Sequence, residues 1–96
     1  MRVAIPHSLG REEAARRLRE RAHEVADFVP GGTAEVAWPS EDRMTLTVRA
    51  MGKAVDGAVE VEERQVVFTV EFPPALSFVE PVIQAAIERK GRKLLT

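Results

Sequence analysis

Cysteine and tyrosine are absent from this 96-residue sequence, which contains only one tryptophan and two histidines. The lack of cysteine excludes disulfides, thiol catalysis and zinc bound through thiolates. The two histidines share no spacing typical of metal ligands, so we expect neither a metal ion nor a cofactor. With so few aromatic side chains, the chain offers no stacking platform for single-stranded nucleic acid.

Long apolar runs and a strong net charge are also missing. No segment approaches the roughly 18–20 consecutive apolar residues that span a bilayer. The first residues do not resemble a signal peptide, because one arginine is followed by three apolar residues and then proline. The formal net charge of −1 creates no field that would attract nucleic acid. We therefore expect a cytoplasmic protein with no transmembrane segment, no nucleic-acid partner and a single domain over residues 1–96.

The sequence begins with a pattern typical of a strand followed by a helix. Val3 and Ile5 alternate with polar or small residues, which predicts a short strand with one buried face. Ser8 or Gly10 is the expected N-cap of the helix. Apolar residues then recur three or four positions apart and form one narrow stripe: Ala15, Leu18, Ala22, Val25 and Val29. Proline and two glycines at 30–32 end this predicted helix.

Four strand-like runs follow the helix. In each of them apolar residues alternate with polar ones, at residues 33–38, 44–50, 55–61 and 66–72. The short connections between these runs favour an antiparallel meander. One face of such a sheet is apolar and needs a cover, which amphipathic helices can supply.

A last helix is expected after residue 80. Pro81 suits its first turn, and Gly91 is expected to weaken it near its end by up to about 1 kcal/mol relative to alanine. One side of this helix carries Ile83, Ala86, Ile87, Lys90 and Leu94. We therefore predict an α+β fold: a single antiparallel β-sheet of about five strands with two helices packed on one face, in the order β-α-β-β-β-β-α.

The residues suited to acid–base chemistry form no recognisable catalytic set. His7 has inward parity at the end of the first strand, and we expect it to be a local capping or turn residue. His23 falls on a helix surface, and Asp56 lies among the outward residues of a strand. No nucleophile or oxyanion site can be named, so we expect no enzymatic activity. The alternative is that His7 and an acidic neighbour hydrolyse or isomerise a small acyl compound.

Large apolar side chains with inward parity leave two alternatives open. Trp38, Phe68 and Phe72 are each at an inward position of a predicted strand. They either pack in the core or line a small apolar cavity between the sheet and the last helix. In the second case Ile87 of the last helix completes the ligand-binding site.

The segment that carries Leu76, Phe78 and Val79 is more apolar than a loop usually is. These side chains either close one end of the sheet–helix sandwich or form an exposed patch that contacts a partner. The neighbouring basic run at residues 89–93 either complements the C-terminal end of a helix or faces an anionic partner. Apolar residues with outward parity, Ala37, Met51, Ala58 and Val67, suggest that a second copy covers part of the sheet as a homodimer.

Five segments of the sequence together resemble one known family. They are RVAIPHSLGREEAARRL, RMTLTVRAMG, the V-x-G-x-V-x-V run at residues 55–61, VEFPPAL and IERKGRKLL. Over essentially its whole length the chain resembles the polyhydroxyalkanoic acid system proteins, most specifically in IPHSLGREEA and RAMG. These are small bacterial proteins whose genes are associated with storage-polyester granules. The resemblance supplies no catalytic residues to carry over.

The resemblance implies a non-enzymatic accessory or regulatory protein of polyhydroxyalkanoate storage. Its partner would be the granule surface or a granule-associated protein, contacted through the apolar residues of 73–81. The order of elements also resembles a reduced helix-grip domain. Larger helix-grip domains hold lipids or other apolar molecules between the sheet and the last helix, so the alternative is a small module that binds an acyl or lipid ligand.

Overall fold

The computed structural model describes residues 1–22, 24, 33–50 and 52–96. The elements of this part of the chain are β1 (Arg2–Pro6), α1 (Arg11–Arg21), β2 (Thr33–Ser40), β3 (Arg43–Ala50), β4 (Lys53–Val61), β5 (Gln65–Glu71), the 3₁₀ helix η2 (Pro74–Val79) and α2 (Glu80–Leu94). The predicted order of strands and α-helices is confirmed, and η2 occupies the apolar segment before the last helix. The predictions for His23, Val25, Val29, residues 30–32 and Met51 lie outside the described residues.

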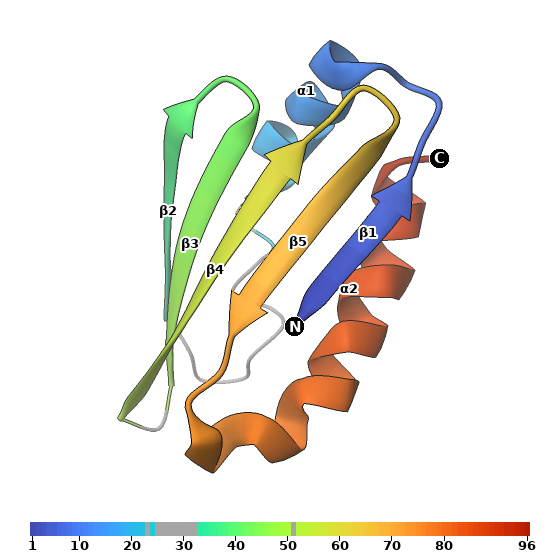
Figure 1. Ribbon diagram of the computed structural model, residues 1–96. Helices are drawn as coiled ribbons and strands as arrows, with labels where there is room; N and C mark the ends of the chain where they lie inside the picture. The colour runs from blue at the N-terminus through green and yellow to red at the C-terminus, as the bar shows by residue number, and fades with distance from the viewer. Residues whose placement is uncertain (23, 25–32, 51) are drawn as a thin grey trace.

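The strands form one antiparallel sheet in the order β1-β5-β4-β3-β2 (Figure 1). β2 to β5 form the predicted meander, because each of these strands pairs with the next one along the chain. β1 extends the sheet beside β5, with Val3 opposite Phe68 and Ile5 opposite Val66. The ammonium group of Met1 donates a hydrogen bond to the carbonyl oxygen of Val70 at 2.9 Å, which anchors the first residue to the same edge.

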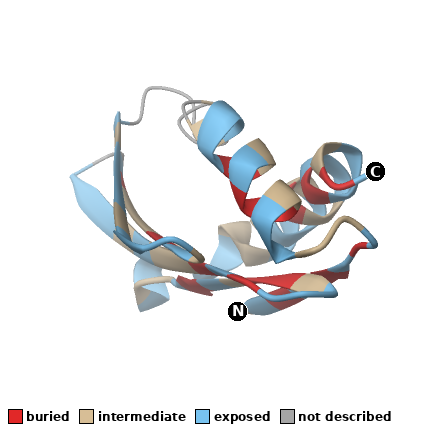
Figure 2. Ribbon diagram, turned by 90° about the horizontal axis from the view of Figure 1, so that it is seen from above, coloured by how far each residue is buried: buried red, intermediate tan, exposed pale blue. Residues whose placement is uncertain are grey.

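Both α-helices lie on the same face of the sheet (Figure 2). α1 buries Ala14, Ala15 and Leu18 against the inward face of the strands, and α2 buries Ile87 and Gly91. The α+β class and the two layers are therefore those that the alternation of apolar residues predicts.

At one end of the sheet the two layers are in close contact. Ile5, Val66 and Val61 lie opposite one another on β1, β5 and β4, and each is at most 3% exposed. Ala14 of α1 and Leu95 at the end of α2 belong to the same buried cluster and complete it from the helical layer. We call this part of the molecule the closed end.

Gly91 lies where the closed end meets the rest of the interior, and besides the predicted weakening of the last helix it has a packing role. A Cβ atom at this position would overlap the Cδ1 atom of Ile5, so any larger residue requires the Ile5 side chain or α2 to shift. The entropic cost of glycine in a helix is about 1 kcal/mol. The close contact of the two layers offsets it, because interiors are stabilised by dense packing.

The start of α1 depends on a residue from another part of the chain. Gly10 is the N-cap residue, as expected for one of two candidates, and its φ of 82° is in the region that favours glycine. No side chain of the helix itself caps this end. Instead, the backbone N–H of Arg11 donates to the Glu63 carboxylate in the β4–β5 turn at 3.4 Å, where a negative charge complements the helix N-terminus.

Candidate functional site: an apolar cavity between the layers

A partly open cavity of about 830 Å³ separates the sheet from the helices away from the closed end. Its floor includes inward residues of β3, β4 and β5 and Phe72, which follows β5: Met44, Leu46, Val48, Val55, Val59, Phe68, Val70 and Phe72. Its opposite wall consists of residues of the helical layer: Leu18, Ala22, Leu76, Val79, Val82, Ile83, Ile87, Gly91 and Leu94. We call the part of the molecule around this cavity the open end.

The positions of the two helices explain why the layers separate. α1 lies near the β2–β3 turn, where the Arg19 guanidinium lies 4.8 Å from the ring centroid of Trp38 and donates to the Glu41 carbonyl at 2.7 Å. α2 instead lies along β1 at the opposite edge of the sheet (Figure 1). Leu46 and Val55, on the strands between these two positions, line the cavity and are only half-buried.

Three of the four residues predicted to bind an apolar ligand line this cavity. Phe68 and Phe72 contribute to its floor, and Ile87 contributes to its helical wall. Trp38 has the same inward parity but is not part of the described lining, because its ring packs beneath Arg19 of α1. The position of α1 accounts for this difference, which alternation along a single strand does not reveal.

The apolar segment before α2 is divided between two environments. Leu76 and Val79 point into the cavity, where both are half-buried, whereas the Phe78 side chain is 71% exposed. Val82, one turn further on, is 68% exposed and lies at the edge of the cavity. The segment therefore closes part of the open end and also presents an apolar surface to solvent.

Basic side chains surround the mouth of the cavity, which the sequence patterns did not predict. Among the described lining residues these cations are Arg21, Lys53, Arg89, Lys90 and Lys93. Glu24 is the one carboxylate in this lining, and it lies 4.0 Å from Arg21. The available signal was the basic run at 89–93, where Arg89 and Lys93 are four positions apart and so share one helix face.

His7 has a structural role at the closed end. It is 9% exposed, its Nε2 lies 3.1 Å from the Glu62 carbonyl oxygen, and its Nδ1 accepts the backbone N–H of Leu9 at 3.2 Å. With Nδ1 as the acceptor, Nε2 is the ring nitrogen that donates to the Glu62 carbonyl oxygen. Both ring nitrogens bind backbone groups, which supports the expected role as a capping residue.

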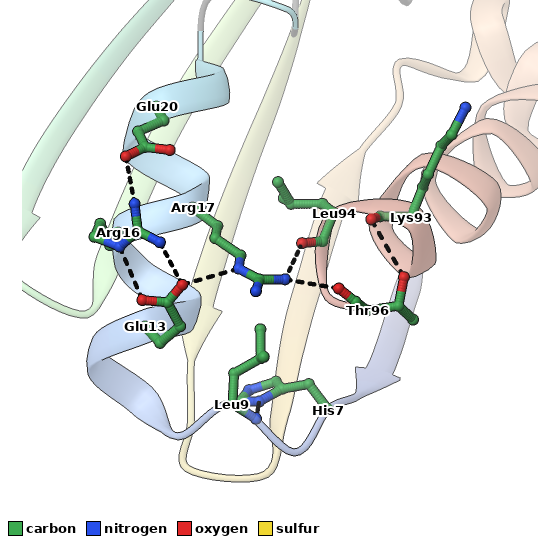
Figure 3. A network of polar contacts seen from close by, with 9 residues as sticks. All are labelled: His7, Leu9, Glu13, Arg16, Arg17, Glu20, Lys93, Leu94 and Thr96. Atoms are coloured by element: carbon green, nitrogen blue, oxygen red, sulfur yellow. Dashed lines mark hydrogen bonds and ion pairs between the residues drawn. The ribbon is translucent and has the colours of Figure 1, made fainter.

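A second polar network joins α1 to the end of α2 (Figure 3). Arg17 donates to the carbonyl oxygens of Leu94 and Thr96 at 3.1 and 2.9 Å and forms an ion pair with Glu13. Arg16 binds the same carboxylate. Hydrogen bonds from Arg16 and then from Arg17 lower the pKa of Glu13 to about 2. The network fixes the helices relative to each other beside the closed end.

Among the residues that the structure describes, the remaining acidic and outward side chains are not grouped into a second site. Asp56 is exposed and accepts a hydrogen bond from the Thr47 hydroxyl across the β3–β4 pair at 3.0 Å. In the part of the chain that the structure describes, no three histidine or carboxylate side chains are grouped as metal ligands. Val67 is 6% exposed within a single chain, so its burial on the outer face requires no second copy.

Almost the whole sequence matches one protein family. Residues 1–95 match the family described as "Putative polyhydroxyalkanoic acid system protein", and the chain belongs to this family. The family name implies an association with polyhydroxyalkanoate systems. No curated protein matches the chain. None of the helices formed by the described residues is both long and apolar enough to cross a membrane.

Proposed function

We propose that this protein is a non-enzymatic accessory protein of a polyhydroxyalkanoate system that binds an acyl chain in the cavity of the open end. The observation that carries the proposal is the cavity itself, which has an apolar floor and an apolar helical wall. Ligand sites of this kind are concave and mostly apolar, with a few polar groups at defined positions. Membership of a family named for polyhydroxyalkanoic acid systems supports hydroxyalkanoic chains, or apolar molecules that accompany them, as the proposed ligands.

The energetics of the open end favour an apolar occupant. Leu46, Val55 and Ile83 are half-buried although they face the interior between the layers. Removing their apolar surface from water contributes a favourable free energy of roughly 25 cal/mol per Å². An acyl chain in the cavity supplies that burial without any movement of the strands. The position also agrees with the resemblance to helix-grip domains, which hold apolar ligands between sheet and last helix.

The proposal is tested by filling the cavity from its floor. Val55→Phe projects a larger side chain into the cavity, whereas Ala54→Phe adds the same ring at the exposed neighbouring position of β4. Calorimetric titration with a medium-chain acyl ligand is expected to show saturable binding by the native chain and by Ala54→Phe. Binding by Val55→Phe is expected to fall at least tenfold. Equal binding by the two variants, or no binding by the native chain, contradicts the proposal.

A second candidate function is contact with the granule surface or a granule protein through Phe78. The observation that favours it is the 71% exposure of this large apolar side chain beside Val82, which is 68% exposed. Exposed apolar patches often mark interaction surfaces. Phe78 is not part of the described cavity lining, so this function is separable from ligand binding.

Two variants separate the two functions in a sedimentation assay with purified granules. Phe78→Ser removes the exposed ring and leaves the cavity lining unchanged, and Val55→Phe does the reverse. If Phe78 mediates contact, only Phe78→Ser remains in the supernatant. If both variants sediment like the native protein, granule contact does not depend on either site and the second candidate is wrong.

A further inference from the structure

We infer that the ligand of the cavity is an acyl chain that ends in an anionic group, and that Arg89 and Lys93 bind this group at the mouth. The inference rests on the proposed function and specifies the chemistry of the ligand. The group is a carboxylate or a phosphate, since arginine and lysine bind both through charge-assisted hydrogen bonds.

Arg89 and Lys93 are placed together at the edge of the cavity. They are four residues apart on α2, so they lie on one side of this helix. Both are exposed, and both also line the cavity. Val82, further toward the start of α2, lines the cavity as well and is 68% exposed. The edge of the cavity along α2 therefore has an apolar surface near the start of this helix and positive charge near its end.

The helix dipole does not account for this arrangement. Cations are favourable in the last turn of a helix, which explains why α2 ends with Arg92 and Lys93. The dipole acts along the helix axis, however, and does not favour one side of the helix. Arg92 is exposed outside the described cavity lining, while Arg89 and Lys93 line the cavity. The dipole therefore does not explain why Arg89 and Lys93 lie on the side of α2 that lines the cavity. An anionic ligand explains this placement.

The charges of Arg89 and Lys93 are not neutralised within the described part of the chain. Neither side chain forms an ion pair there, in contrast to Arg16 and Arg17, which share Glu13. Among the residues drawn in Figure 3, the Arg17 guanidinium contacts Glu13, Leu94 and Thr96, whereas Lys93 is bonded through its backbone carbonyl. Exposed cations at the mouth of an apolar cavity complement an amphiphile with a negative head group.

The experiment compares three ligands with the same chain of twelve carbons. Dodecanoate, dodecyl phosphate and 1-dodecanol are titrated calorimetrically below their aggregation limits. Each is tested against the native chain, Arg89→Gln/Lys93→Gln, and the control Arg64→Gln/Arg92→Gln. The control removes the same charge from exposed residues outside the described lining. For two exposed charge contacts, the expected loss of anion affinity in the first variant is about tenfold.

The expected result is that one or both anions bind the native chain more tightly than dodecanol does, and that only the variant of Arg89 and Lys93 loses this preference. Preference for dodecanoate alone or for dodecyl phosphate alone identifies the head group. Equal affinity for anions and dodecanol, or equal losses in the two variants, overturns the inference while the proposed function stands. Absence of binding by all three ligands, dodecanol included, contradicts the proposed function itself.

Discussion

The closed and open ends of this molecule are both lined by apolar residues of the sheet and the helices, and they differ in how closely the layers approach. At the closed end Ile5, Val61 and Val66 are almost completely buried, and Gly91 allows α2 to approach Ile5 of β1 closely. At the open end Leu46 and Val55 face a cavity of about 830 Å³. A small domain thus combines a packed core, which provides stability, with an apolar space that is available for a ligand.

The difference arises from the few contacts that fix the helices. Arg17, His7 and Gly91 all act at or beside the closed end, where they join segments that are distant in the sequence. α1 is fixed at the other edge of the sheet by Arg19. Interiors normally pack densely, and this contrast is the basis of the proposal that the open end binds a ligand.

The difference in packing between the two ends is tested most strongly by truncating one isoleucine to alanine at each end. Ile5→Ala removes buried methyl groups at the closed end and is expected to lower the free energy of unfolding by about 3–4 kcal/mol. Ile83→Ala at the half-buried cavity wall is expected to cost only about 1 kcal/mol. Urea denaturation measures both values. Equal losses would mean that the two ends are packed alike.

Gly91→Ala tests the close approach of α2 to β1. The added methyl group overlaps Cδ1 of Ile5. The cost of about 1–3 kcal/mol for overpacking exceeds the gain of up to about 1 kcal/mol in helix propensity. Ile5→Val removes that Cδ1 atom, so Gly91→Ala is expected to become neutral or stabilising in this background. A double-mutant cycle by chemical denaturation measures the coupling, and simple additivity would refute the contact.

Arg17→Met tests the link between the helices. It removes hydrogen bonds to the carbonyl oxygens of Leu94 and Thr96, with an expected loss of about 1 kcal/mol. Hydrogen exchange is expected to accelerate in the last turn of α2. Arg16→Met is the matched control, because within the described residues Arg16 binds the carboxylates of Glu13 and Glu20 on its own helix, and a smaller loss is expected. A larger loss for Arg16→Met would assign the stabilisation to α1 alone.

The smallest expected effect is the pH dependence contributed by Glu13. Hydrogen bonds from Arg16 and Arg17 hold the pKa of this carboxyl at about 2, below its ordinary value of 4.5. The folded state therefore stabilises the ionised form of Glu13. The contribution of this residue to the free energy of unfolding is fully present above pH 4.5 and is lost as the pH falls toward 2. Urea midpoints measured between pH 6 and pH 2 are expected to fall less for Glu13→Gln than for the native chain. Parallel curves would contradict this contribution.

The sequence allowed the fold class to be predicted, because strand alternation and helical spacing are local properties. It also assigned Phe68, Phe72 and Ile87 to the interior between the layers. It did not separate Trp38 from these residues, since their parity is the same and only the position of α1 distinguishes them. From the sequence, Gly91 was expected only to destabilise its helix. Its packing role was not visible because Ile5, which it contacts, lies at the other end of the chain.

The positions of the cations were equally hard to predict. The basic run at 89–93 is visible in the sequence, but the side of α2 that faces the cavity depends on where the helix lies on the sheet. The apolar segment before α2 was treated as one surface. In the structure the backbone of η2 turns Leu76 and Val79 inward and leaves Phe78 exposed. Each of these features depends on contacts between distant residues.

The most direct test of the account is to locate an acyl chain by methyl NMR on the native protein. On addition of dodecanoate, the methyl groups of Leu46, Val55 and Ile83 are expected to show intermolecular contacts with the chain. Those of Ile5, Val61 and Val66 at the closed end are expected to show none. Contacts confined to the surroundings of Phe78, or no contacts with any methyl group of the open end, would contradict the central claim that the cavity is the ligand site.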